Sequence, residues 1–201
     1  EATGIVEMII REKRNTTRNL SYEDIAVLYR TNAQSRAFEG ELRKNNIPYR
    51  IYGGTSFYQR KEIKDTLAYF RLAVNPKDNE ALLRALTFPS RGIGDTTMKK
   101  VTLCAIENNQ SYLEVMRHPD NFPLDMSGPM RKKISAFAAM IDELSAQSEE
   151  MDAFNFAEML LKQTGLTTAL MMDRTVEGID RAQNVQELLN AIREFVTQRA
   201  N

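Results

Sequence analysis

Residues 88–100 carry the run Phe88-Pro89-Ser90-Arg91-Gly92-Ile93-Gly94-Asp95-Thr96-Thr97-Met98-Lys99-Lys100, in which two glycines precede a typical helix start. Glycine reaches positive φ without strain, so Gly92 and Gly94 predict a tight turn. Asp and Thr are common at helix caps and in the first turn, so a helix is expected to begin directly afterwards. Because the first N–H groups of a helix have no partner within it, the run predicts a corner with several free donors at one anion site.

Two interpretations of this corner follow from its residues. In the first, the free N–H groups hold a nucleic-acid phosphate, helped by nearby hydroxyl and ammonium groups. In the second, the run is an ordinary corner between two helices, with Gly ending one helix and Asp capping the next. Short glycine motifs often occur by chance, so the pattern alone favours the second. The side chains that would assist a phosphate are those of Thr96, Thr97, Lys99 and Lys100.

The chain around and beyond this turn has the periodicity of helices and no convincing strand. The apolar stripe is clearest near the C-terminus, where Val185 and Leu188 share one face and are expected to lie in the core. Met159, Met171 and Met172 are likewise expected to pack inside. The predicted helices cover residues 61–74, 79–88, 96–108, 111–117, 129–146, 153–164, 166–172 and 177–198.

The first 52 residues show a different pattern, in which helices alternate with short runs of β-forming residues. Helices are expected over residues 2–14 and 34–44, and strands over residues 24–30 and 47–52. The run from Ile25 to Tyr29 is apolar throughout, as in a parallel-sheet strand that is covered on both faces. Two strands cannot form a stable sheet alone, so this αβαβ segment is expected to belong to a larger α/β domain.

Gly53 and Gly54 separate the two patterns. Adjacent glycines beside small polar residues predict the most flexible point of the sequence. The predicted fold class is therefore mainly α, with a small α/β N-terminal part that holds an incomplete sheet, followed by an all-helical part.

The charge of the chain is balanced overall but uneven along its length. The 201 residues include 27 Lys and Arg against 27 Asp and Glu. Residues 1–100 hold 18 basic and 12 acidic residues, whereas residues 101–201 hold 9 and 15. A net charge of zero argues against a protein that coats nucleic acid through bulk electrostatics. The basic surplus places any contact with a polyanion in the first half.

No sequence feature indicates a membrane protein or an exported one. The chain has no apolar run near 18 residues and no signal peptide, so a cytoplasmic protein is expected. Its one cysteine, Cys104, excludes an internal disulfide, fits a reducing compartment and is expected to be buried in its apolar surroundings. The chain begins at Glu1 and not at a methionine, and we expect it to be a piece of a longer protein.

The familiar nucleotide-binding and catalytic motifs are absent from the sequence. There is no G-x-x-x-x-G-K-[ST] loop, and residues 92–94 lack the third glycine of the Rossmann fingerprint. His118 is the only histidine and lies in a loop beside Pro119, where it is expected to be exposed. No cluster of Cys and His offers metal ligands. We therefore expect no catalytic residue and no metal site in these 201 residues.

Five blocks of the sequence stand in an order and at a spacing that resemble the UvrD/PcrA/Rep helicases, which are superfamily 1 DNA motors. The match is specific over residues 24–94, whereas beyond residue 101 only the helical pattern agrees. The blocks are DIAVLYRTNAQSR at 24–36, NIPYRIYGGTSFY at 46–58, EIKD at 62–65, NP at 75–76 and RGIG at 91–94.

The resemblance implies a place within such a motor. Residues 1–56 would be a partial RecA-like segment of domain 2A, and residues 57–201 most of the helical 2B subdomain. In these helicases ATP and Mg²⁺ bind between two RecA-like domains, and hydrolysis moves the motor 3′ to 5′ along one DNA strand. The Walker A loop, the acidic Mg²⁺ motif and the strand-separating pin lie outside these 201 residues. The helicase activity is therefore expected of the longer protein, and neither a cofactor nor catalysis is expected of this segment alone.

The resemblance also assigns roles to particular residues. Gly53 and Gly54 fall at the junction of 2A and 2B and are the expected hinge for a swivelling 2B. Arg30 and Asn32 match positions that touch the tracking single strand, although strand-end capping would explain them equally well. The glycine turn would hold duplex backbone without reading sequence. The duplex candidates are Arg91, Gly92, Ile93, Gly94, Thr96, Thr97, Lys99 and Lys100.

Other classes of function stay open at this point. The chain could be a helical protein-interaction module whose acidic second half docks a repair or replication protein, in which case the turn is only a corner. It could also be a free-standing DNA-binding protein, which the incomplete sheet disfavours. Asp95 counts against a phosphate site unless its carboxylate caps its own helix. Salt-sensitive DNA binding that depends on Gly92 and Gly94 would separate these possibilities.

Overall fold

The computed structural model describes residues 2–15, 19–30, 34–52 and 54–200. Within these ranges the chain forms ten α-helices joined by turns and short 3-10 segments, so the prediction of a mainly α fold is confirmed. The chain divides into two compact units, Glu1–Ile63 and Lys64–Asn201. Among the described residues, none of the helices is long and apolar enough to cross a membrane.

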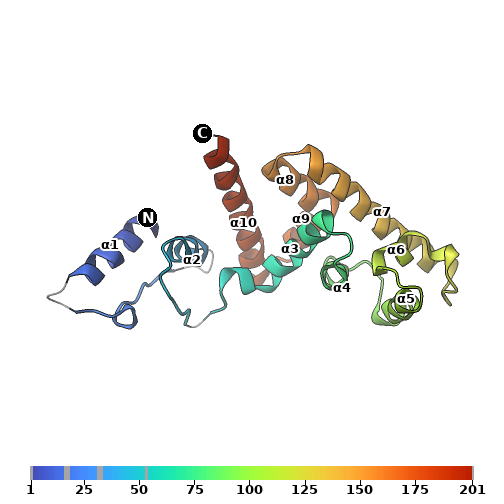
Figure 1. Cartoon of the computed structure of the whole chain (residues 1–201), viewed down its shortest axis with the longest axis horizontal. Helices are drawn as coiled ribbons and strands as arrows, with labels where there is room; N and C mark the ends of the chain where they lie inside the picture. Colours follow the sequence, from blue (N-terminus) through green and yellow to red (C-terminus); the bar gives the residue numbers. More distant parts are fainter. Residues whose placement is uncertain (1, 16–18, 31–33, 53, 201) are drawn as a thin grey trace. The chain divides into compact units, whose positions relative to one another are not determined.

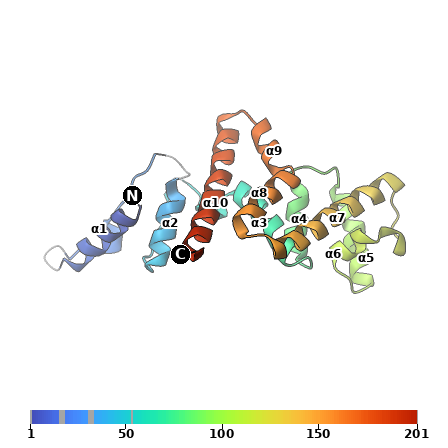
Figure 2. The same ribbon diagram turned by 90° about the horizontal axis from the view of Figure 1, so that it is seen from above.

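The N-terminal unit is built on two helices, α1 (Ala2–Arg14) and α2 (Ser35–Lys44), which lie side by side (Figures 1 and 2). Val6 and Ile9 of α1 lie on one face of the helix and pack against Ile47. Two 3-10 turns complete the unit, η1 (Tyr22–Asp24) and η3 (Phe57–Gln59). This apolar cluster is small, so the polar contacts of α2 matter for the stability of the unit.

The predicted strands at residues 24–30 and 47–52 form no sheet in the described part of the chain. Ile25 is extended, with φ −112° and ψ 126°, and both Ile25 and Val27 pack on the cluster of α1. Leu28, however, is 94% exposed. The expected cover on both faces is therefore wrong, because no neighbouring strand in the described residues pairs with this segment.

The C-terminal unit contains the helices that were predicted beyond residue 57, each with ends within about one turn of the expected ones. They are α3 (Lys61–Val74), which enters this unit at Lys64, α4 (Asn79–Thr87), α5 (Asp95–Glu107), α6 (Tyr112–Arg117), α7 (Gly128–Glu150), α8 (Ala153–Gln163), α9 (Leu166–Met172) and α10 (Val176–Ala200), with a 3-10 turn η4 (Pro119–Asn121) before α7.

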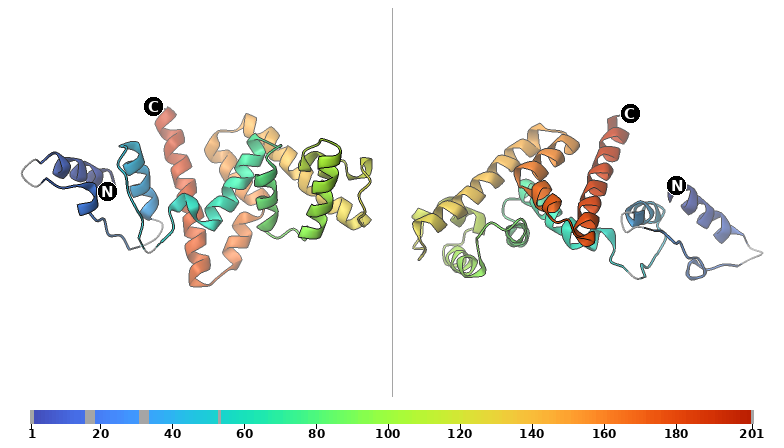
Figure 3. Two further views of the ribbon diagram at one scale, coloured as in Figure 1. Left: turned by 60° about the horizontal axis from the view of Figure 1, so that its bottom comes forward. Right: turned by 180° about the vertical axis from the view of Figure 1, so that it is seen from behind.

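The long helix α7 runs past α6 at one end and reaches α8 at the other (Figure 1). Its apolar face buries Ile134, Ile141 and Leu144. Helices α9 and α10 form a hairpin that packs against α8 (Figure 3). Phe70 of α3 meets Phe156 of α8 edge to face, with 5.9 Å between ring centroids. The core of this unit thus joins helices that are far apart in the sequence.

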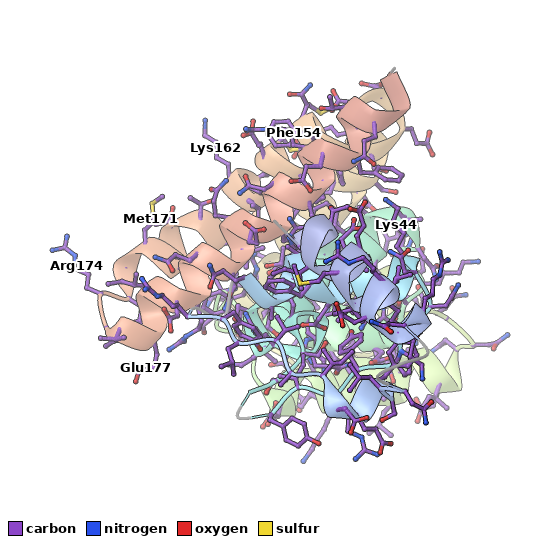
Figure 4. All side chains as sticks on the ribbon, turned by 90° about the vertical axis from the view of Figure 1, so that its left-hand side faces the viewer. Lys44, Phe154, Lys162, Met171, Arg174 and Glu177 are labelled. Atoms are coloured by element: carbon purple, nitrogen blue, oxygen red, sulfur yellow. The ribbon has the colours of Figure 1, made fainter. Side chains whose placement is uncertain are left out.

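The predicted burial of Met171 and Met172 is wrong. Their side chains are 71% and 78% exposed, and Figure 4 shows Met171 projecting away from the ribbon. The short helix α9 buries Leu166 and Leu170, which are one turn apart on a single face. Because each residue advances the helix by about 100°, the two residues after Leu170 fall outside that face.

Candidate nucleic-acid interface

The glycine turn connects α4 to α5, as expected. Gly92 has φ +66°, in the left-handed region that favours glycine. Gly94 has φ −90° and ψ 174°, an extended conformation that any residue adopts. The expectation of positive φ is therefore right for Gly92 and wrong for Gly94. Between them Ile93 is buried and anchors the turn to the helical core.

The N-terminus of α5 has no side-chain cap. Its N-cap residue is Gly94, so Asp95 is the first helical residue and does not cap its own helix as the sequence allowed. Helix α8 differs, since the Asp152 carboxylate accepts from two of its first N–H groups. Within the described residues the N–H groups of Asp95, Thr96 and Thr97 have no acceptor. The exposed Asp95 carboxylate beside these donors counts against an anion there.

The two lysines of α5 differ in their surroundings. Lys100 Nζ lies 2.9 Å from Asp125 Oδ2, and this pairing lowers the pKa of the Asp125 carboxyl. Lys99 is exposed and, within the described ranges, pairs with no carboxylate. The unneutralised charge on α5 close to the free donors is therefore that of Lys99.

A further cation at the turn comes from α7 and was missed by sequence reasoning. A Cβ placed on Gly92 would lie 3.0 Å from Lys133 Nζ, so this exposed lysine reaches the turn itself. Its neighbour Lys132 lines an open groove of about 370 Å³ at the start of α7, together with Arg131 and His118. The adjacent lysines were visible in the sequence, but only the packing of α7 brings one of them to Gly92.

Arg91, one of the predicted duplex ligands, is directed toward the interior of the unit. Its Nη2 donates to the Thr164 carbonyl at 2.8 Å and lies 2.9 Å from the Tyr69 hydroxyl. Its guanidinium also lies over the rings of Tyr69 and Phe137. These contacts separate Arg91 from the lysines of the turn, which face solvent.

The residues predicted to touch single-stranded DNA and to form the hinge lie in the N-terminal unit. Arg30 is exposed, and its backbone N–H donates to Gln34 Oε1 at 3.0 Å, directly before α2. Gly54 is exposed as well. Asn32 and Gly53 lie outside the described residues.

A buried carboxylate connects both sides of the glycine pair to α2. Glu39 accepts from the Phe57 backbone N–H at 2.8 Å, from the Tyr49 hydroxyl at 3.1 Å and from the Ser56 hydroxyl. Three residues after Phe57, Arg60 Nη2 donates to the buried Ser35 hydroxyl of α2 at 2.9 Å. The segment that follows the glycine pair is thus fastened to α2.

Among the described residues, no group of three or more His, Cys, Asp or Glu side chains could hold a metal ion.

The comparisons with known proteins match nearly the whole chain. The whole chain, residues 1–201, matches the family model for the UvrD-like helicase C-terminal domain. The ATP-dependent DNA helicase PcrA of Staphylococcus aureus (strain NCTC 8325 / PS 47) is 32% identical over 195 residues, which are 97% of this chain and 26% of that helicase. PcrA of Staphylococcus epidermidis (strain ATCC 12228 / FDA PCI 1200) has the same identity and coverage. The chain therefore spans about a quarter of the length of these relatives.

Proposed function

Because the chain belongs to the UvrD-like helicase C-terminal domain family, we propose that it is the duplex-contacting segment of an ATP-dependent DNA helicase. Residues 1–56 would form part of domain 2A and residues 57–201 most of subdomain 2B. ATP and Mg²⁺ would bind to other domains of the longer protein. The segment itself would hold DNA and would not hydrolyse ATP.

The observation that carries the proposed DNA contact is the open space at Gly94. A Cβ placed on Gly94 meets nothing within 4 Å, and its backbone suits any residue, so the fold does not require glycine here. A glycine at the N-cap does, however, let a phosphate approach the free N–H groups of α5 closely. Lys99 and Lys133 would complete the site by contributing charge that no carboxylate in the described residues neutralises. The carboxylate of Asp95 would weaken phosphate binding at this site without preventing it.

The test compares the two glycines, because they differ in what the fold demands. Gly94→Ala should lower stability by less than about 1 kcal/mol and leave the chain folded, because alanine is a poorer N-cap than glycine but the position is open and its backbone suits any residue. It should weaken binding to a hairpin duplex several-fold in fluorescence anisotropy, because a methyl group would stand where the phosphate approaches. Gly92→Ala should lower stability by about 1 kcal/mol, because the left-handed φ is strained for alanine.

The titrations would be run at low and at moderate salt, with single-stranded DNA of the same length as a comparison. Duplex binding that weakens with salt and falls in folded Gly94→Ala supports the phosphate site. Binding by Gly94→Ala that equals that of the unmodified chain would reduce the turn to a structural corner. Circular dichroism verifies the fold of each variant.

The proposed function includes a hinge and a single-strand contact in the N-terminal unit. Gly53 and Gly54 would let 2B swivel, while Arg30 and Asn32 would touch the tracking strand. Because Glu39 bonds to residues on both sides of the glycine pair, a swing at Gly53 would require some of these bonds to open.

A second candidate function is docking of a repair or replication protein. Exposed apolar side chains at the α9–α10 turn favour it, and Figure 4 shows Met171, Arg174 and Glu177 projecting from this end. Met171→Gln combined with Met172→Gln should then abolish capture of such a protein and leave duplex affinity unchanged. The exposed apolar side chains of the turn are those of Met171, Met172, Val176 and Ile179.

A further inference from the structure

Arg91 is held in the helical unit by two hydrogen bonds and by two aromatic rings. Its two hydrogen-bonding partners belong to Thr164 and Tyr69, whose side chains are 1% and 0% exposed. The ring centroids of Tyr69 and Phe137 lie 5.7 Å and 5.5 Å from its guanidinium carbon. Its Nε is buried as well and has no acceptor in the described residues. A lysine lacks the planar guanidinium that makes these polar and aromatic contacts together.

The Thr164 carbonyl is a favourable partner for a cation. Thr164 is the C-cap residue of α8, and Gly165 follows with φ +72°. The last carbonyls of a helix lack partners within it and carry the negative end of the helix dipole. Arg91 thereby ties the glycine turn to the end of a helix that lies about 70 residues further along the chain.

Tyr69 extends this connection to the other side of the turn. Its hydroxyl lies 2.7 Å from the Ala85 carbonyl, in the last turn of α4, and 3.2 Å from the Phe88 carbonyl, where the turn begins. Burial raises the pKa of Tyr69, so the hydroxyl keeps its proton and remains a donor at neutral pH. Arg91 and Tyr69 together join α3, the end of α4, the turn and the end of α8.

We infer that Arg91 is a positioning residue, which fixes the glycine turn from inside the helical unit and does not itself hold the phosphate. This inference rests on the proposed contact between the turn and duplex DNA. Arg91 directly precedes Gly92, so the direction of its side chain determines how the turn leaves the core. The contacts of Arg91 inside the unit thereby set the orientation of the free N–H groups at the start of α5.

The experiment uses the 201-residue chain and a hairpin duplex in anisotropy titrations over a series of KCl concentrations. Arg91→Lys and Tyr69→Phe are the test variants, and Tyr69 is too deeply buried to touch DNA. Arg71→Lys, on the exposed side of α3, and Tyr112→Phe, at the start of α6, are matched controls. Lys99→Gln is the reference for a lost phosphate contact.

Both test variants should bind duplex several-fold more weakly than the controls and keep the salt dependence of the unmodified chain, because the same phosphates are contacted. The slope of log K against log salt is negative, and Lys99→Gln should reduce its magnitude by about 0.9. If Arg91 were a phosphate ligand, Arg91→Lys would retain most of the affinity, since lysine also binds phosphate, and Tyr69→Phe would bind as the unmodified chain does. Either of these two results overturns the inference.

A second measurement needs no DNA and separates this inference from the proposed function. The backbone amide resonances of Gly92 and Gly94 should shift in Arg91→Lys and stay in place in Arg71→Lys. Unchanged resonances in Arg91→Lys overturn the inference whatever the DNA titrations give. If the unmodified chain binds no duplex, the proposed function fails, and the amide resonances still decide whether Arg91 positions the turn.

Discussion

At the scale of single residues, adjacent side chains of the same type can contribute very differently to an electrostatic site. Lys99 and Lys100 follow each other on α5, yet Lys100 already pairs with the Asp125 carboxylate, which is fully exposed. A lysine that keeps its counter-charge releases fewer ions when a phosphate arrives. The two residues therefore differ in their expected share of duplex binding.

Lys99→Gln should reduce the salt dependence of duplex binding by about 0.9 in the logarithmic slope, and Lys100→Gln by clearly less. Asp125→Asn, which removes the counter-charge of Lys100, should make the salt dependence steeper. Anisotropy titrations between low and moderate KCl measure all three. Equal slopes for Lys99→Gln and Lys100→Gln would show that the Asp125 pair is not maintained in the complex.

The role of a residue at the glycine turn depends on its contacts with distant parts of the chain, which the residues next to it in sequence do not predict. The resemblance to the UvrD/PcrA/Rep helicases placed Arg91 among the expected duplex ligands, because it directly precedes the glycine turn. Its contact with Thr164 joins positions that are far apart in the sequence, and no local pattern encodes that contact. Lys133 was missed for the same reason.

At the scale of elements, helix α2 is held by polar groups as well as by apolar ones. Its buried face carries Ser35 and Glu39, whereas the apolar side chains of Phe38 and Leu42 are only half-buried. The Glu39 carboxylate accepts a hydrogen bond from the backbone N–H of Phe57. A buried N–H group that loses its acceptor destabilises the folded state.

Glu39→Ala should lower the free energy of unfolding of the N-terminal unit by about 2 kcal/mol, because the Phe57 N–H would lose its partner. Hydrogen exchange at the Phe57 amide should accelerate accordingly. The control is Glu41→Ala on the same helix, which removes a half-exposed pair with Lys44 and should cost no more than about 0.5 kcal/mol. Unchanged exchange at Phe57 in Glu39→Ala would contradict the assigned role.

The N-cap of α8 makes the stability of the fold depend on pH in the acidic range. The N–H of Asn155 and, to a lesser extent, that of Phe154 donate to the Asp152 carboxylate and lower its pKa. A carboxyl whose pKa is lower in the folded state stabilises the fold above its unfolded pKa, near 3.9, and this stabilisation is lost as pH falls through the folded value.

The melting temperature of Asp152→Asn should therefore lie below that of the unmodified chain at pH 6, and the difference should shrink at pH 3. Asp180→Asn, an exposed change on α10, should leave the pH profile as it is. Scanning calorimetry at the two pH values measures both. A difference that stays the same at pH 3 would assign the effect to packing and not to the charge of the cap.

At the scale of the whole molecule, the helices could be predicted from sequence much better than the sheet. Apolar stripes and local caps such as Ser127 before α7 are encoded within about 20 residues, so α3 to α10 were anticipated. A strand is stable only when another strand pairs with it. The run from Ile25 to Tyr29 has the composition of a buried strand. In the described residues, however, apolar side chains pack on only one of its faces.

The helical unit carries most of the buried apolar side chains of the chain. A shortened chain of residues 57–201, which keeps all of α3, should therefore unfold cooperatively and bind a hairpin duplex with an affinity similar to that of the 201-residue chain. Urea titration followed by circular dichroism and anisotropy measures both properties. Loss of duplex binding in a folded 57–201 chain would assign the contact to the first 56 residues.

The single cysteine has a practical consequence for following motion. Cys104 is 5% exposed in α5, and burial raises the pKa of its thiol, so little reactive thiolate is present at neutral pH. Maleimide dyes should therefore leave it unlabelled in the native chain. A cysteine introduced at exposed Lys44 and another at Arg174 would carry a donor and an acceptor dye without removal of the native thiol. Energy transfer between them would then report whether the distance between the two units changes when DNA is added.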